Sequence, residues 1–98
     1  MDKVFFTIAG IWHYYGNEFF KPDMTVHLVK EPDNKYDTEA IQVKIKGLGV
    51  IGYVANSTKT VLGDTMSAGR IYDRFKNKAK GKVMIVTPRG VVCRLVKK

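Results

Sequence analysis

Residues 24–54 read MTVHLVKEPDNKYDTEAIQVKIKGLGVIGYV, and this stretch decides the fold. Apolar and polar residues alternate over 24–30 and again over 40–46, a pattern that is typical of half-buried β-strands. The segment 31–38 between them is dense in turn-forming residues. Glycines at both ends of 47–49 predict a hairpin turn into a third strand over 50–54. The stretch therefore predicts three strands, the last two of them joined as a hairpin.

The segments on either side of this stretch add a helix and further strands. Apolar residues recur at helical spacing after Ser57, a good N-cap, and Gly69 is a suitable C-cap, so a helix is predicted from Ser57 to Ala68. The segment 71–76 is compatible with either a short helix or an irregular strand. Strand-forming residues occupy 4–9, 82–87 and 91–96. We expect one domain over residues 1–98, mostly β with one or two helices, folded as a small OB-like or SH3-like, partly open β-barrel.

The positive charge of the chain is concentrated in its second half. The 98 residues carry a formal net charge of +8. Residues 1–49 hold six lysines and seven acidic residues, whereas residues 50–98 hold eleven basic and two acidic residues. Such asymmetry favours a polyanionic partner, with nucleic acid ahead of an anionic membrane surface. The alternative is that the charge serves solubility alone.

Few residues offer catalytic or metal-binding chemistry. The single cysteine excludes an intramolecular disulfide and points to a reducing, cytoplasmic environment. The soft metal ligands His13, His27 and Cys93 have no zinc-site spacing, and nucleophile-elbow and phosphate-loop motifs are absent from the sequence. We also expect no signal peptide, and the sequence contains no apolar run long enough to span a membrane. We therefore expect a non-enzymatic protein without a metal, a cofactor, a small-molecule substrate or a membrane partner.

Several short motifs identify a family resemblance. They are WHYYG at 12–16, VKEPDNKYD at 29–37, AIxV at 40–43 and IGYV at 51–54. In this order and spacing they resemble the HIRAN domain over about residues 6–66. The resemblance implies an OB-like barrel that binds single-stranded DNA at its free 3′ end.

The resemblance also implies which side chains contact DNA. Tyr14 and Tyr36 match the aromatic residues that stack on the terminal bases, and Asp37 matches the carboxylate that accepts a hydrogen bond from the 3′-hydroxyl. A carboxylate near a polyanion is repulsive unless it meets a donor, which a terminal hydroxyl provides and an internal phosphodiester does not. The alternative role for Asp37 is to cap the backbone of its own turn. The chain departs from the family pattern at three positions that bear on DNA contacts: His13, Tyr53 and Asn56 stand where the family has an arginine, a histidine and a lysine.

A basic segment follows the predicted helix. Arginines at 70 and 74 alternate with aromatic residues, and lysines follow at 76, 78, 80 and 82. One interpretation is a patch that tracks the phosphate backbone and replaces the contacts that His13 and Asn56 lack. The other is a solvated strand edge whose lysines discourage aggregation. The candidate DNA-binding residues are His13, Tyr14, Lys35, Tyr36, Asp37, Tyr53, Asn56, Arg70 and Arg74.

Three functions follow from these observations. The first is a module that binds single-stranded DNA or DNA ends. The second is an adaptor that recruits a helicase or nuclease through the basic second half. The third, a small hydrolase, lacks a visible nucleophile–base pair or metal site.

Overall fold

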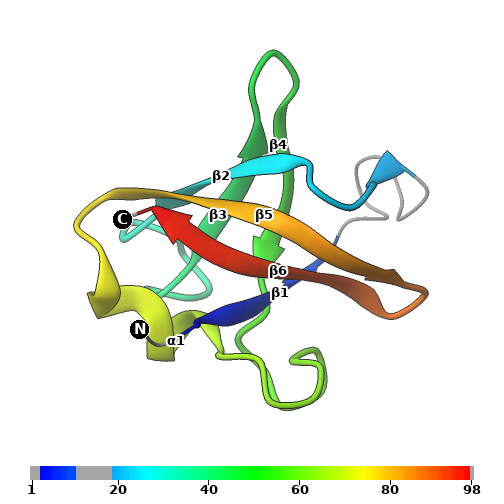
Figure 1. Ribbon diagram of the computed structural model, residues 1–98. Coiled ribbons are helices and arrows are strands. Elements are labelled where there is room, and N and C mark those ends of the chain that lie inside the picture. The colour runs from blue at the N-terminus through cyan, green and yellow to red at the C-terminus, as the bar shows by residue number, and fades with distance from the viewer. Residues whose placement is uncertain (1–2, 11–18, 98) are drawn as a thin grey trace.

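The computed structural model describes residues 3–10 and 19–97, and within them a barrel of β-strands is the main feature (Figure 1). A short helix, α1 (Ala68–Ile71), and a 3₁₀ helix, η3 (Tyr72–Arg74), lie between the fourth and fifth strands of the chain. The strands are β1 (Phe5–Ala9), β2 (Thr25–Lys30), β3 (Ile41–Ile45), β4 (Gly49–Val54), β5 (Lys78–Thr87) and β6 (Gly90–Lys97).

The strands form a closed antiparallel barrel in the order β1-β4-β3-β2-β5-β6, because β6 pairs back onto β1. The prediction of a small, mostly-β, OB-like barrel is confirmed, but the barrel is closed rather than partly open. Strand β5 is longer than predicted and pairs with β2 on one side and β6 on the other. Its lysines therefore do not mark a strand edge, and that interpretation is wrong.

The interior of the barrel is filled by the alternate residues that the sequence pattern selects. Val26 and Leu28 on β2 and Ile41 and Val43 on β3 are fully buried. They pack in one core cluster with Phe6, which is also fully buried. The outward positions of the same strands are partly or fully exposed and, apart from Val29, polar or basic, so these strands bury one face and expose the other.

The helix predicted over 57–68 does not form. The chain makes a single turn, in which the amides of Thr60 and Val61 both donate to the carbonyl of Ser57 at 2.9 Å. It then passes through Gly63, whose φ of 54° is left-handed. Helix α1 begins only at Ala68.

Hydrogen bonds to the barrel replace the bonds of the predicted helix. The amide of Met66 donates to the carbonyl of Phe5 at 2.7 Å, and the amide of Ala68 donates to that of Ala55 at 2.9 Å. Ser67 then caps α1 by accepting from the amide of Arg70, and Gly69 lies inside α1 rather than after it. These tertiary contacts override the local helical propensity.

Lys30 attaches the segment after α1 to the barrel. Its ammonium group donates to the carbonyl of Phe75 at 2.7 Å. The same group lies 4.3 Å from the centroid of the Tyr72 ring and 5.0 Å from that of Phe75. The aromatic residues of the basic segment therefore face Lys30 in cation–π contacts.

Thr7 is the buried polar residue that holds the 57–67 segment. Its side chain is fully buried, and its hydroxyl lies 2.8 Å from the hydroxyl of Thr65. The same oxygen accepts from the amide of Leu62 at 3.2 Å.

Thr7→Val is expected to lower the free energy of unfolding by ~1–3 kcal/mol, because valine keeps the shape but leaves the Leu62 amide without its acceptor. Urea unfolding measures this loss. Thr25→Val, at an exposed position of β2, is the matched control and is expected to change stability by less than ~0.5 kcal/mol. Equal stabilities of the two variants would contradict this role for Thr7.

Candidate nucleic-acid interface

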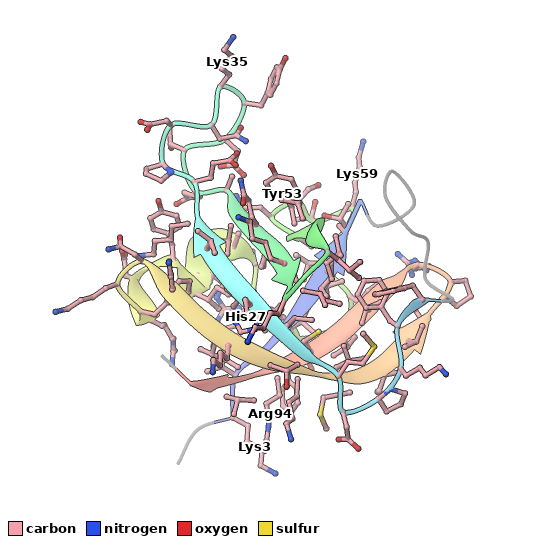
Figure 2. The ribbon with its side chains drawn as sticks, turned by 90° about the horizontal axis from the view of Figure 1, so that it is seen from above. Lys3, His27, Lys35, Tyr53, Lys59 and Arg94 are labelled. Atoms are coloured by element: carbon pink, nitrogen blue, oxygen red, sulfur yellow. The ribbon has the colours of Figure 1, made fainter. Side chains whose placement is uncertain are left out.

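The loop over residues 31–40 is shaped by its own hydrogen bonds. The side-chain oxygen of Asn34 accepts from the amides of Tyr36 at 2.9 Å and Asp37 at 3.0 Å, as in an Asx turn. The base of the loop is closed by the amide of Glu31, which donates to the carbonyl of Ala40 at 2.8 Å. This turn leaves Tyr36 95% exposed at the loop tip, and Figure 2 shows the neighbouring Lys35 projecting away from the barrel.

Asp37 joins this loop to the segment after β4. One carboxylate oxygen accepts from the amide of Glu39 at 2.9 Å, and the other accepts from the side-chain amide of Asn56 at 2.9 Å. The side-chain oxygen of Asn56 in turn accepts from the amide of Gly69 at 2.8 Å. Asp37 thus has the turn-capping role that the sequence left open. A carboxylate has about four lone-pair positions, so it retains capacity for a further donor.

Tyr53 is positioned by a carboxylate that the sequence analysis did not select. Its hydroxyl donates to the two carboxylate oxygens of Glu31, at 3.3 and 3.4 Å. The side-chain amides of Asn34 and Gln42 donate to the same carboxylate. Tyr53 lies directly across from Gln42 in the β3–β4 pair, so only the strand register reveals this cluster.

These side chains surround a shallow hollow between the loop and the end of β4. Ala40, Val54 and Ala55 contribute buried, small or medium-sized side chains to its lining. Small lining residues leave room for a planar group beside the tyrosine rings. The polar and aromatic residues that line the hollow are Asn34, Tyr36, Asp37, Tyr53, Asn56, Ser57 and Thr60.

Comparison with models of protein families decides the family. The HIRAN domain model matches residues 1–94 of the 98. The chain belongs to the HIRAN family. No curated protein and no solved structure was found to match the chain. The family match extends beyond the motifs at 12–54 into β5 and β6, and it indicates DNA binding as the general function.

The hollow of this HIRAN domain contains four of the predicted DNA-binding residues, namely Tyr36, Asp37, Tyr53 and Asn56. Arg70 lines a neighbouring hollow that shares Asn56 and Ser57 with the first. Arg74 is exposed on η3 and is not among the residues that line either hollow. His13 and Tyr14 lie outside the described residues.

The charge of the 31–40 loop beside the hollow is negative. The 31–40 loop carries four carboxylates, on Glu31, Asp33, Asp37 and Glu39, against one ammonium on Lys35. The loop of this HIRAN domain therefore does not attract phosphates by itself, and it favours a ligand group that donates hydrogen bonds.

Cys93 belongs to the core of the HIRAN barrel rather than to a reactive site. It is fully buried on β6, opposite Phe6 and Val83, and burial raises the pKa of its thiol to about 12. Over residues 3–10 and 19–97, no group of three or more His, Cys, Asp and Glu side chains is arranged to hold a metal ion. No helix in this same part of the chain is long and apolar enough to cross a membrane.

The raised pKa of Cys93 predicts that the folded protein resists thiol reagents. Iodoacetamide at about pH 8 is expected to leave native Cys93 unmodified and to alkylate it in urea, as mass spectrometry would report. Because the unfolded thiol ionises before the folded one, stability is expected to fall as pH rises from about 9 toward 12. Rapid alkylation of the native protein would contradict this assignment.

Proposed function

We propose that this HIRAN domain binds the 3′ end of single-stranded DNA in the hollow between the 31–40 loop and β4, without catalysing a reaction. The observation that carries the proposal is the Tyr36 ring, which is 95% exposed and stands at the hollow beside Asp37. An aromatic side chain in this position is available to stack on a base.

Stacking and end recognition would be performed by different residues. The Tyr36 ring stacks on a base of any type, so it supports binding that tolerates sequence. Asp37 is held by Asn56 and by the amide of Glu39, and it accepts the hydrogen bond of a terminal sugar hydroxyl. An internal phosphodiester has no donor to offer, and the acidic loop repels it.

The test compares two oligonucleotides of the same sequence, one with a 3′-hydroxyl and one with a 3′-phosphate. The 3′-hydroxyl form is expected to bind ~10- to 100-fold more tightly by fluorescence anisotropy, since a hydrogen bond to a charged group contributes ~1.5–3 kcal/mol. Asp37→Asn is expected to lose this preference. Asp33→Asn, which removes the same charge from an exposed position of the same loop, is expected to keep it. Equal affinities of the wild type for both ends would refute end recognition.

A second candidate is an adaptor that recruits a helicase or nuclease. The exposed side chains of Lys76, Lys78, Lys80 and Lys82 support it, since they offer an acidic protein a basic surface. If the protein is an adaptor, it is expected to bind a purified helicase or nuclease, and Tyr36→Ala is expected to leave that affinity unchanged. This function also predicts no measurable affinity for either oligonucleotide.

A further inference from the structure

The outer surface of the barrel has one sign of charge. The described strands contain no Asp or Glu, and their charged residues are all basic. Lys30 is turned toward η3 and the Lys97 side chain is not described, so neither counts here. The other basic residues of the strands have exposed or half-exposed side chains. Together they define the outer basic face, which consists of Lys44, Lys78, Lys80, Lys82 and Arg94.

Strand register brings these residues into rows across the barrel. His27 lies between Lys44 on β3 and Lys80 on β5. In the next row, Lys82 is directly across from Arg94. Alternate residues of one strand are ~6.8 Å apart and neighbouring strands ~4.8 Å apart. Both spacings are shorter than the screening length of ~8 Å at physiological ionic strength, so the charges of the β5 lysines act together with that of Arg94. Lys44 lies two strand spacings, or ~9.6 Å, from Lys80.

This arrangement is unfavourable in the absence of a ligand. Like charges directly opposite each other destabilise a pair of strands, as Lys82 and Arg94 do here. In the described part of the chain, the Nε atom of Arg94 is buried without a hydrogen-bond partner. A polyanion would neutralise the rows, and none of the strand residues supplies a carboxylate to do so.

The outer basic face continues from the hollow. Tyr53 on β4, which lines the hollow, pairs with Gln42 on β3. Gln42 pairs in turn with Val29 on β2, and Val29 pairs with Lys78 on β5. One row of paired residues therefore joins the hollow to β5. Three strand spacings separate Tyr53 from Lys78, or ~14 Å. In Figure 2, His27 lies between Tyr53 on one side and Arg94 on the other. A DNA strand that leaves the hollow along this row therefore meets Lys78, then Lys80 and Lys82.

We propose that the outer basic face binds the phosphodiester backbone of the DNA strand whose 3′ end occupies the hollow. The inference rests on the proposed function and extends it, because the acidic loop reads the end while the attraction for phosphates comes from the barrel. The charge of the two surfaces supports this division: four carboxylates and one ammonium in the loop, and only basic charges on the strands.

The test uses the salt dependence of binding to two oligonucleotides, a trinucleotide that fills only the hollow and a strand of about 12 nucleotides. Lys80→Glu/Lys82→Glu is expected to weaken binding of the longer strand by at least ~10-fold. It should also reduce the slope of log affinity against log salt by about 1.4, or ~0.7 for each lost phosphate contact. The trinucleotide is expected to bind as it does to the wild type.

The matched control is Lys21→Glu/Arg89→Glu. It makes the same change in net charge at exposed positions before β2 and between β5 and β6, which belong neither to the outer basic face nor to the residues that line the hollow. It is expected to keep the wild-type slope. The Lys80→Glu/Lys82→Glu variant is also expected to melt at the same temperature as the wild type or a few degrees higher, since it removes like-charge pairs.

Three results would overturn the proposal. The first is a wild-type slope for the longer strand in Lys80→Glu/Lys82→Glu. The second is an equal loss of slope in the control variant. The third is binding of the wild type to vesicles of phosphatidylserine but not to the longer strand. By contrast, if Tyr36→Ala leaves trinucleotide binding unchanged while the slope still falls in Lys80→Glu/Lys82→Glu, only the role of the hollow fails.

Discussion

Tyr36→Ala is expected to weaken the binding of a short single-stranded oligonucleotide by about 5- to 150-fold, without lowering the stability of the protein. The loss corresponds to one stacked base, ~1–3 kcal/mol. Stability should not change because the ring is 95% exposed and the turn beneath it is held by the backbone amides and the side chain of Asn34. Fluorescence anisotropy and urea unfolding measure the two quantities separately.

Two control variants make this result specific to the ring. Tyr36→Phe retains the aromatic face and is expected to bind nearly as the wild type does. Leu48→Ala removes another exposed apolar side chain, 44% exposed in the β3–β4 turn, and is expected to have no effect. If Tyr36→Phe binds as weakly as Tyr36→Ala, the hydroxyl rather than stacking is responsible.

Asn56→Asp is expected to lower the free energy of unfolding by ~1–3 kcal/mol at neutral pH and to abolish selective binding of DNA ends. The substitution places a second carboxylate where the Asn56 amide now donates to Asp37 at 2.9 Å. Two carboxylates at this separation raise the pKa of one of them. The folded variant then binds more protons than the unfolded chain, so its stability falls as pH rises and recovers as pH falls. Urea unfolding at about pH 5 and about pH 8 measures the difference.

The reciprocal exchange provides the decisive control. Asp37→Asn combined with Asn56→Asp restores one amide and one carboxylate to the pair. It is expected to recover part of the lost stability at neutral pH, because the side chain of residue 56 also faces the Glu39 carboxylate, to which the Asn56 amide donates at 3.4 Å. Asn77→Asp, at an exposed position before β5, adds the same charge without a facing carboxylate and is expected to change little. A stability deficit in Asn56→Asp that does not depend on pH would contradict the electrostatic explanation.

Local patterns in the sequence were sufficient to predict the strands and the loop. Alternation located β2 and β3 because each strand buries one face, and the turn-forming residues located the 31–40 loop. Alternation carries no information about which strands pair, so the closure of β6 onto β1 was not predicted. The prediction of a helix over 57–68 was wrong for a related reason. The amides of Leu62 and Met66 in this segment donate to Thr7 and Phe5, which are more than 50 residues away in the chain.

The candidate site was predicted only in part, because local sequence patterns do not reveal contacts between residues far apart in the chain. Tyr36 and Asp37 belong to a contiguous motif, so the sequence alone selected them. The contact between Asp37 and Asn56 joins residues 19 positions apart, and the contact between Tyr53 and Glu31 joins residues 22 positions apart. Only the packing of the loop against β4 brings these pairs together, so the role of Glu31 depended on the three-dimensional structure.

Closure of the barrel restricts how any partner is recognised. A sheet with a free edge is able to bind an extended peptide by adding it as a further strand, through backbone hydrogen bonds that depend little on side chains. Here the backbone groups of β1 and β6 already bond to each other. Recognition therefore depends on side chains and loops, which substitutions alter one at a time while the barrel stays intact. We expect homologous barrels to change ligand preference at these positions without a change of fold.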